Sequence, residues 1–385
     1  MSALISVRNL TRVFDVSKPW LNRVIERLPR ALLTAVSDVS FEVEERSVYA
    51  LVGESGSGKS TIGKIVVGLV PPSEGTVEVR GVDLSNSADR QAIAAVRADI
   101  QMIFQDPFAS LNPRWRVRDI IEEPVSVLGG DTTGLAEKLL EQVGLSASDV
   151  GKFPHEFSGG QRQRICIARA LASEPKVIVC DEPTSALDVS VQAQVLNLMS
   201  DLREEYGLTY LFISHDLTVV QHMADVIGVL YLGRLVEEAP RDTLFETPKH
   251  PYTQMLFEAA PRMDGFGRDI DVPQGEIPDA INPPPGCAFH PRCPIAVGRC
   301  REERPEMRKI GRTRGEQRPG QAFDHPVEPG FRDVEHAGEV ANGDQRAHAP
   351  ASCNGAALVN GNQQAACPSQ EAISGPGAWR HFSCA

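Results

Sequence analysis

Apolar runs alternate with amphipathic segments in the middle of the chain, and this alternation predicts its core. From about residue 161 to 235, short apolar runs follow longer segments with helical spacing; the runs include KVIVCDE, TYLFISHD and VIGVLYLG, and the longest helical segment is VQAQVLNLMSDLREEYG. Strands that are apolar almost throughout are typical of a parallel sheet buried on both faces. Their alternation with helices therefore predicts an α/β domain with a mostly parallel sheet.

The flanking parts of the chain have different patterns. Over residues 1–80, short segments rich in β-branched residues predict strands: LISVRNLTRVF, AVSDVSFEV, SVYALVG and GTVEVRG. From about 85 to 160 the pattern is polar and mostly helical. After about residue 262, Pro and Gly become frequent and strand patterns disappear. Residues 310–378 are rich in Gly, Ala, Gln and Asn, so we expect them to be largely disordered or linker-like.

Composition and charge exclude several classes of protein. A length of 385 residues suggests two domains, or one large domain with an extension. Apolar residues make up 42% and charged residues 23%, which excludes wholesale disorder. The net charge of −12 argues against a protein that coats nucleic acid non-specifically. No apolar run approaches the ~18 residues of a membrane span, and the N-terminus lacks a signal-peptide pattern, so we expect a cytosolic chain.

A glycine-rich segment predicts a phosphate-binding loop. Residues 53–60, GESGSGKS, match the pattern GxxxxGKS between the apolar run SVYALV and the helical pattern TIGKIVVGL. Glycines let backbone N–H groups curl around phosphate at a helix N-terminus. Lys59 can neutralise the β- and γ-phosphates, and the Ser60 hydroxyl can ligate Mg²⁺. We expect a nucleotide to bind here.

Two carboxylates follow a buried strand further along the chain. Asp181 and Glu182 come directly after the apolar run VIVC, and ligands of open α/β sheets bind at the carboxyl ends of strands. Asp181 suits Mg²⁺, and Glu182 suits general-base work on an attacking water. The alternative is an acidic turn that merely ends a strand, which the presence of a phosphate loop in the same chain disfavours.

A second candidate anion site lies about a hundred residues after the first. Ser158 is a natural N-cap before the helical pattern RQRICIARAL, and Gly159 and Gly160 expose backbone N–H groups at the positive end of that helix. The phosphate loop already holds one nucleotide's phosphates. The segment therefore either caps the nucleotide of another protomer or is only a glycine-containing helix cap.

Five motifs occur in an order that identifies a family. GESGSGKST, FSGGQRQR, VIVCDEP, SALD and FISHD together resemble the ATP-binding subunit of ABC transporters, over about residues 4–262. The resemblance implies a P-loop NTPase fold of the ABC type over residues 1–262. Such a domain has a mostly parallel sheet, an antiparallel β subdomain and a helical subdomain, here at about 106–165. An irregular Cys-containing extension at 263–309 and a low-complexity tail at 310–385 would follow.

The resemblance also implies roles for individual residues. Gln105 would sense the metal and the attacking water, His215 would hydrogen-bond the γ-phosphate, and Phe14 would stack on adenine. The implied catalytic residues are Lys59, Gln105, Glu182 and His215, and the implied Mg²⁺ site is Ser60, Gln105 and Asp181. Contacts to nucleotide, including those made across a dimer, would come from Phe14, Gly53, Glu54, Ser55, Gly56, Ser57, Gly58, Lys59, Ser60, Thr61, Ser158, Gly159, Gly160, Gln161 and Asp188.

Further segments resemble the peptide-importer branch of this family, which also includes nickel systems. They are IFQDPFASLNPR, VLYLGRLVEEAP, LFETPKHPYTQMLFEAAP and INPPPGCAFHPRCPIAVGRC. The branch implies an ATPase that drives import of di- and oligopeptides from the cytoplasmic face of the bacterial inner membrane. Its partners would be a second, different ATP-binding subunit, two membrane permeases and an extracytoplasmic solute-binding protein, with no nucleic acid. Nickel, glutathione or another small solute remains an alternative cargo.

The eight cysteines fall into two groups. Cys166 and Cys180 lie in apolar segments and are expected to be buried free thiols. The other six follow residue 285, and some relatives hold a 4Fe–4S cluster with a trio spaced like Cys287, Cys293 and Cys300. The fourth ligand would be Cys384, with Cys353 and Cys367 as rivals. Zinc or no metal at all remain alternatives, and His290 is expected to be a packing or surface residue.

Three other classes of ATPase fit less well. DNA-maintenance ATPases with the same nucleotide sandwich interrupt their core with long heptad-repeat arms, which the sequence lacks. ABC-type translation factors need two cassettes, and only one phosphate loop is present. A kinase would share the phosphate loop but leave the SGGQ segment and His215 without a role.

Overall fold

The computed structural model describes residues 3–27, 29–85, 90–259, 275–276, 278–310 and 320–323. Contacts divide the chain into two units, residues 1–330 and 331–385, and all described residues belong to the first unit. The predicted tail beyond residue 310 therefore lies outside the described residues, except for residues 320–323. Across these ranges, each helix is too short or too polar to cross a lipid bilayer.

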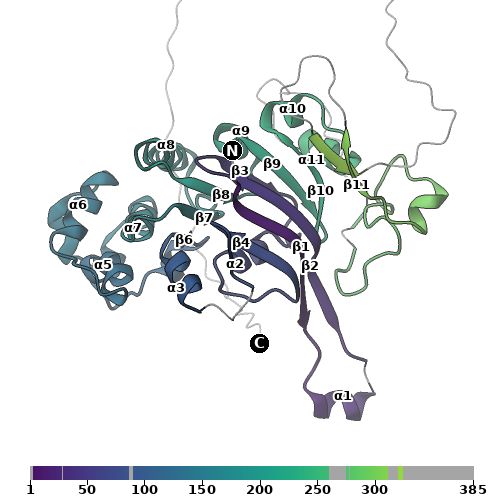
Figure 1. The fold of residues 1–385 in the computed structure, drawn as a ribbon, viewed down its shortest axis with the longest axis horizontal. Coiled ribbons are helices and arrows are strands. Elements are labelled where there is room, and N and C mark those ends of the chain that lie inside the picture. Colours follow the sequence, from purple (N-terminus) through teal and green to yellow (C-terminus); the bar gives the residue numbers. More distant parts are fainter. Residues whose placement is uncertain are drawn as a thin grey trace, which may run out of the picture. The chain divides into compact units, whose positions relative to one another are not determined.

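Five parallel strands form one side of the larger sheet, with β6 at its edge (Figure 1). They are β3 (Val48–Val52), β6 (Ile100–Ile103), β7 (Val177–Asp181), β8 (Thr209–Ile213) and β9 (Val226–Tyr231), and they lie side by side in the order β9-β3-β8-β7-β6. Every residue of β3, β7 and β8 is buried. The continuous apolar runs of the sequence predict such strands, which are buried on both faces.

Two hydrophobic cores lie on opposite faces of this sheet. On β3, Tyr49 and Leu51 belong to the first core, on the first face, whereas Ala50 and Val52 belong to the second core, on the second face. This alternation follows from the two-residue repeat of a strand, which points successive side chains to opposite faces. The predicted α/β domain, with a parallel sheet covered on both faces, is confirmed.

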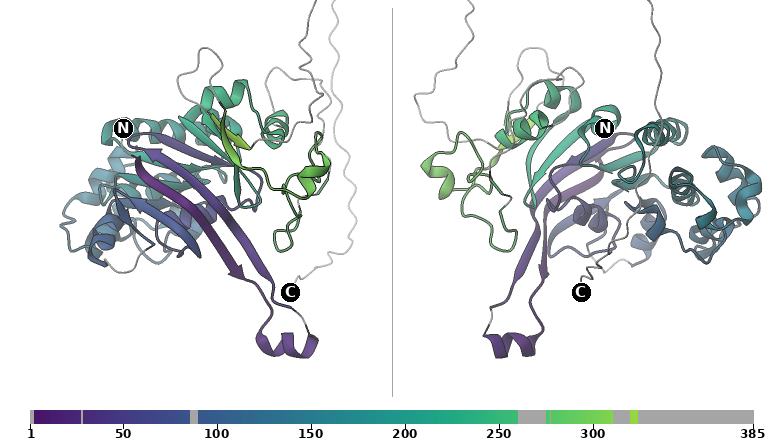
Figure 2. Two further views of the ribbon diagram at one scale, coloured as in Figure 1. Left: turned by 45° about the vertical axis from the view of Figure 1, so that its right-hand side comes forward. Right: turned by 180° about the vertical axis from the view of Figure 1, so that it is seen from behind.

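An antiparallel sheet and one helix cover the first face. The sheet consists of β1 (Ala3–Asp15), β2 (Leu32–Glu44), β4 (Glu74–Val79) and β5 (Val82–Asp83), in the order β2-β1-β4-β5. Its apolar side chains share a core with those of α2 (Lys59–Val66), the helix that follows β3. The β1–β2 hairpin extends beyond the sheet and carries α1 (Trp20–Glu26), none of whose residues is buried (Figures 1 and 2).

Helices cover the second face and continue into a separate helical group. Those over the sheet are α7 (Gly159–Leu171), α8 (Val189–Tyr206) and α9 (Leu217–Met223), all of which contribute to the second core. The helical group contains α4 (Pro107–Ser110), α5 (Val117–Val127), α6 (Leu135–Gln142) and the short 3₁₀ turns η1 (Ala147–Gly151) and η2 (Pro154–Glu156). α5 packs against both α6 and α7, which ties the group to the sheet. On the other side, α3 (Arg90–Ala98) contacts β5 and β6.

The C-terminal part adds strands that the sequence pattern did not predict. After β10 (Arg234–Pro240), α10 (Arg241–Glu246), α11 (Pro251–Glu258) and η3 (Gly298–Arg301) come β11 (Met307–Ile310) and β12 (Gly320–Phe323). β12 pairs antiparallel with β10, and β11 pairs with β12, which extends the sheet to eight strands. The expectation that strands end near residue 262 is therefore wrong, because four-residue strands are too short to show a repeat. Their pairing covers the edge of β10, which would otherwise be open.

The central position of β3 predicts which core substitutions destabilise the fold most. Leu51 is 0% exposed and lies between β8 and β9, so Leu51→Ala should leave a cavity and cost about 3 kcal/mol in the free energy of unfolding. Leu69→Ala is the matched control, because Leu69 is 59% exposed and should cost less than ~0.5 kcal/mol. Urea unfolding measures both values, and equal losses would contradict the assignment of β3 to the core.

Candidate functional site

The segment Gly53–Ser60 forms a tight loop between β3 and α2. Gly53, Gly56 and Gly58 have φ angles of +146°, +79° and +100°, which side chains rarely adopt. A Cβ atom at Gly53 would lie 2.2 Å from the carbonyl oxygen of Leu230, and one at Gly58 would lie 2.3 Å from that of Ala35. Glycine is thus required at both positions, by the φ angle and by the close backbone.

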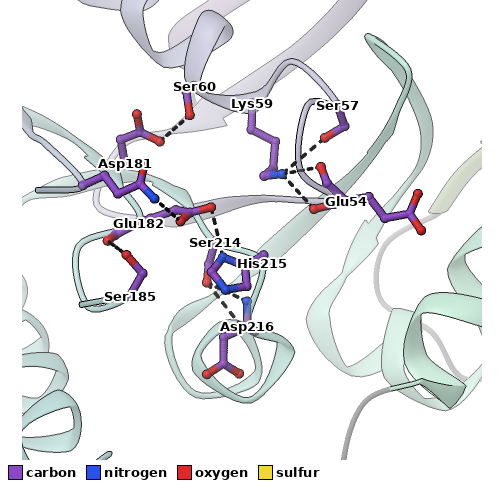
Figure 3. A network of polar contacts seen from close by, with 12 residues as sticks. Glu54, Ser57, Lys59, Ser60, Asp181, Glu182, Ser185, Ser214, His215 and Asp216 are labelled. Carbon is purple, nitrogen blue, oxygen red and sulfur yellow. Dashed lines mark hydrogen bonds and ion pairs between the residues drawn. The ribbon is translucent and has the colours of Figure 1, made fainter. Parts of the chain in front are cut away.

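Lys59 is the first residue of α2, and its amine points back into the loop (Figure 3). Its Nζ atom donates to the carbonyl oxygens of Gly53 and Glu54 at 2.7 and 2.9 Å, and to the Ser57 hydroxyl at 3.3 Å. The residue is 5% exposed, and this burial lowers the pKa of the Lys59 amine, while the carboxylates of Glu182, Asp181 and Glu54 oppose the shift. The amine therefore lies in a place where a nearby anion would stabilise its charge.

Asp181 lies beside the start of α2. It is the last residue of β7, and its Oδ1 atom accepts a hydrogen bond of 2.8 Å from the Ser60 hydroxyl (Figure 3). Burial raises the pKa of the Asp181 carboxyl, although Ser60 and Lys64 act in the opposite direction. A hydroxyl and a carboxylate at this distance form the oxygen donor set that Mg²⁺ prefers, so these residues fit the predicted metal.

Glu182 directly follows β7, and its carboxylate contacts side chains that follow the two neighbouring strands. Gln105 follows β6 and His215 follows β8, and both side chains contact its carboxylate: Gln105 donates from Nε2 to Oε2 at 2.8 Å, and His215 Nδ1 lies 3.0 Å from Oε1. Glu182 has a φ of +48°, uncommon for a residue other than glycine, and its N–H donates to the carbonyl oxygen of Ile213 at 2.9 Å. Backbone strain of this kind is often found at functional sites. The two neighbours fix the direction of the carboxylate.

A cavity of about 590 Å³ connects these groups. It is large enough for a nucleotide, since ligand cavities typically measure about 300–1,000 Å³. Eight of the predicted nucleotide contacts line it: Phe14, Ser55, Gly56, Ser57, Gly58, Lys59, Ser60 and Thr61. The predicted catalytic residues Gln105, Glu182 and His215 line it as well. Residues that the motifs did not single out complete the lining: Leu33, Thr34, Ala35, Leu232 and Ala280. Gly53, Glu54 and Asp181 lie behind this lining, in contact with Lys59 and Ser60.

The SGGQ segment lies apart from this cavity. Ser158 caps α7: its hydroxyl accepts from the N–H of Gln161 at 3.4 Å, while Gln161 Oε1 accepts from the N–H of Ser158 at 2.9 Å. Gly160 lets α7 approach α8, because a Cβ atom there would lie 2.3 Å from Val191 Cγ1. Asp188 is the N-cap residue of α8. The helix-cap interpretation thus holds within one chain, and the predicted second anion site would need a facing subunit.

The described cysteines do not form a metal centre. Cys287 and Cys300 are buried in the second core, Cys293 is half-buried, and all three are free thiols. Among the described residues, no group of three or more His, Cys, Asp or Glu side chains is placed to hold a metal ion. Burial raises the pKa of the Cys287 and Cys293 thiols. The iron–sulfur and zinc hypotheses therefore have no support here; Cys353, Cys367 and Cys384 lie outside the described residues.

Cys166 and Cys180 are buried free thiols, as the sequence predicts. Both are free and at most 1% exposed, and burial raises the pKa of both thiols, so they behave as small apolar side chains. His290 likewise packs locally, because its Nδ1 atom lies 2.9 Å from the carbonyl oxygen of Cys287.

The motifs missed two residues that contact the loop from the C-terminal part. The Tyr252 hydroxyl accepts from the N–H of Glu54 at 2.9 Å, and the Arg292 guanidinium pairs with the Glu54 carboxylate. Both lie in segments already noted, PKHPYT and CAFHPRC, but nothing in the sequence indicates that these segments fold against the phosphate loop.

Comparisons with known proteins agree with the fold. The family model described as "ABC transporter" matches residues 36–185, and the model "Oligopeptide/dipeptide transporter, C-terminal region" matches residues 236–300. The oligopeptide transport ATP-binding protein AppF of Bacillus subtilis is 46% identical over 313 residues, covering 80% of this chain and 94% of AppF. The dipeptide transport ATP-binding protein DppF of Escherichia coli is 46% identical over 311 residues, covering 78% and 92%.

Solved structures give the same fold. A dimeric, post-hydrolysis structure of the ATP-binding cassette MJ0796, bound to ADP and Pi, matches with a TM-score of 0.53 and 27% identity, covering 62% of this chain and 98% of that one. The structure of cbiO1 from Clostridium perfringens matches in fold with a TM-score of 0.53, covering 64% and 92%. The extent of the sequence matches and the assembled phosphate-loop cavity lead to one conclusion: the chain belongs to the ATP-binding proteins of ABC transporters.

Proposed function

We propose that this chain binds and hydrolyses ATP to drive the import of di- and oligopeptides across the bacterial inner membrane. One observation carries the enzymatic part. A single cavity brings the Lys59 amine together with a carboxylate, Glu182, that Gln105 and His215 hold in place. An amine for the phosphates and an oriented base for water are the two elements that hydrolysis of a phosphoanhydride needs.

The nucleotide would lie along the cavity from Phe14 to the loop. The Phe14 ring lines the cavity, and the Arg12 guanidinium stacks over it at 4.5 Å, which leaves an aromatic wall for adenine. The backbone N–H groups of the loop and the Lys59 amine would hold the phosphates. Ser60, Asp181 and Gln105 would hold Mg²⁺, which when bound neutralises charge on the phosphate oxygens.

Glu182 would act as the general base. Its carboxylate accepts a proton from a water molecule, whose oxygen attacks the γ-phosphorus. The bond between that phosphorus and the β–γ bridging oxygen breaks, and ADP leaves with the bond's electron pair. The contacts from Gln105 and His215 keep the carboxylate directed toward the cavity, so little reorganisation is needed during the reaction.

A complete site would require a second ATP-binding subunit. The N-terminus of α7, with Gly159 and Gly160, is a positive helix end outside the cavity of its own chain. In a head-to-tail pair it would face the γ-phosphate bound by the partner, with Asp188 near the dimer contact. The dimeric structure of the MJ0796 cassette, which resembles this chain, supports pairing of two such subunits.

The names of the relatives support peptides as cargo. AppF, and the DppF proteins of Escherichia coli and Pseudomonas aeruginosa, are named for transport of oligopeptides, dipeptides and di- or tripeptides. The second family model points to the same group. The other partners would be two permeases and an extracytoplasmic binding protein, with this chain at the cytoplasmic face of the membrane. Nickel and glutathione are the alternatives that a transport assay must separate from peptides.

The base assignment predicts the behaviour of Glu182→Gln. The amide cannot accept the water's proton, so ATP hydrolysis should fall by about 100-fold or more, while ATP binding persists and ATP drives the subunits into a stable dimer. Steady-state phosphate release measures the rate, and size-exclusion chromatography with Mg²⁺–ATP detects the dimer. The control is Glu141→Gln on α6, an exposed site remote from the cavity. Hydrolysis by Glu182→Gln at the wild-type rate would show that another group is the base.

The transport assignment predicts a specific loss of uptake. In cells that carry this gene, replacing it with the Glu182→Gln form should abolish uptake of labelled di- and oligopeptides, because the transporter cannot complete its cycle. The Glu141→Gln strain should take up peptide normally. Normal peptide uptake with a loss of Ni²⁺ or glutathione uptake in the same strains would replace peptides by that solute.

A further inference from the structure

The C-terminal extension is joined to the phosphate loop by a largely buried ion pair. Arg292 donates from Nη1 and Nη2 to Oε2 and Oε1 of Glu54, at 2.8 and 2.9 Å, although the two residues are 238 positions apart. The Arg292 side chain is 4% exposed and that of Glu54 is 23% exposed. A two-bond pair between a planar guanidinium and a carboxylate fixes direction as well as distance.

A second contact holds the same loop residue through its backbone. The Glu54 N–H donates to the hydroxyl of Tyr252, which lies on α11 and is fully buried. Both the side chain and the N–H of Glu54 are therefore occupied by residues that follow the last parallel strand. Neither group is left to contact phosphate, so this loop position serves the loop's shape.

Aromatic side chains fix the position of Arg292. Its guanidinium lies 5.9 Å from the Tyr231 ring centre and 6.0 Å from that of Phe289. These two rings and Tyr252 form one cluster, with centres 4.6 to 5.5 Å apart. Tyr231 ends β9, whereas Phe289 belongs to the extension and is 1% exposed. Phe289 thus packs the extension against Tyr231 of the sheet, and this packing places Arg292 beside the phosphate loop.

The Arg292–Glu54 pair holds the loop residue whose backbone contacts the Lys59 amine. The carbonyl oxygens of Gly53 and Glu54 both accept from Lys59 Nζ, so a movement of Glu54 moves two of the three acceptors of that amine. The extension also reaches the cavity directly, because Ala280 contributes to its lining. Displacement of a catalytic group by about 1 Å can cost a large factor in rate.

We propose that Arg292 is a positioning residue for the nucleotide site: the extension holds the phosphate loop in its binding shape through the Arg292–Glu54 pair. The inference rests on the proposed ATP-binding role of the loop. It makes the extension a part of the ATPase site, so that any partner or modification that displaces residues 287–300 lowers the affinity for ATP. Loss of one partner leaves a buried charge unpaired, which strains the loop in addition to breaking the link.

A double-mutant cycle on the full-length chain tests this inference. Arg292→Gln and Glu54→Gln should each weaken binding of a fluorescent ATP analogue about tenfold, equivalent to ~1.4 kcal/mol, with Mg²⁺ present. The double variant should bind no more weakly than either single variant, because both substitutions remove the same interaction. Arg292→Lys, which keeps the charge but loses the two-bond geometry, should fall in between. In steady-state assays KM for ATP should rise more than kcat falls.

Arg299→Gln is the matched control. Arg299 lies in the same extension, but it pairs with the exposed Glu303, and its side chain is 65% exposed. It should change neither affinity nor KM. If Arg292→Gln fails to fold, Glu54→Gln decides the question, since its side chain is partly exposed and the substitution keeps its shape.

The binding assay gives different results if the proposed function is wrong and if only the role of Arg292 is wrong. If the wild-type chain does not bind the ATP analogue, the proposed function is wrong and this inference falls with it. If the wild type binds but Arg292→Gln and Glu54→Gln bind equally well, the inference alone is overturned. A lower melting temperature with unchanged ATP affinity would likewise overturn it, because the pair would then contribute only to stability.

Discussion

The close approach of the phosphate loop to two backbone carbonyls is the constraint on which the site depends. The Leu230 carbonyl lies against Gly53 and the Ala35 carbonyl against Gly58, so the loop is held between β9 of the large sheet and β2 of the antiparallel sheet. Only glycine leaves room for this packing. With the loop held at both ends, α2 begins at Lys59, and its first residues face the carboxyl ends of the parallel strands.

Those strand ends explain why residues far apart in the sequence form one site. Gln105, Glu182 and His215 follow β6, β7 and β8, which are adjacent and parallel, so their carboxyl ends lie at the same edge of the sheet. Burial of the strands positions the backbone, and the left-handed turn at Glu182 directs its carboxylate toward the other two side chains. The chemistry of the site therefore follows from the packing of the sheet.

The sequence predicts local features well and distant contacts poorly. Residues 53–60 and the strand before Asp181 could be recognised because the loop, the apolar run and the following helix are contiguous. β11 and β12 could not, because strands of four residues carry no repeat. Arg292 and Glu54 look like two ordinary charged residues in the sequence, and only the folded aromatic cluster around Tyr252 brings them together. The SGGQ segment was recognised as a motif, but one chain shows only its helix cap.

The electrostatics of the site favour a ligand that carries both signs of charge. Burial lowers the pKa of Lys59 and raises that of Asp181, so desolvation disfavours the charged form of each. Phosphate oxygens relieve the cost at Lys59, and a divalent cation relieves it at Asp181. A phosphate without a cation would leave Asp181 next to additional negative charge, and a cation alone would repel Lys59. A nucleotide and a cation together would thus compensate these two buried charges better than either one alone.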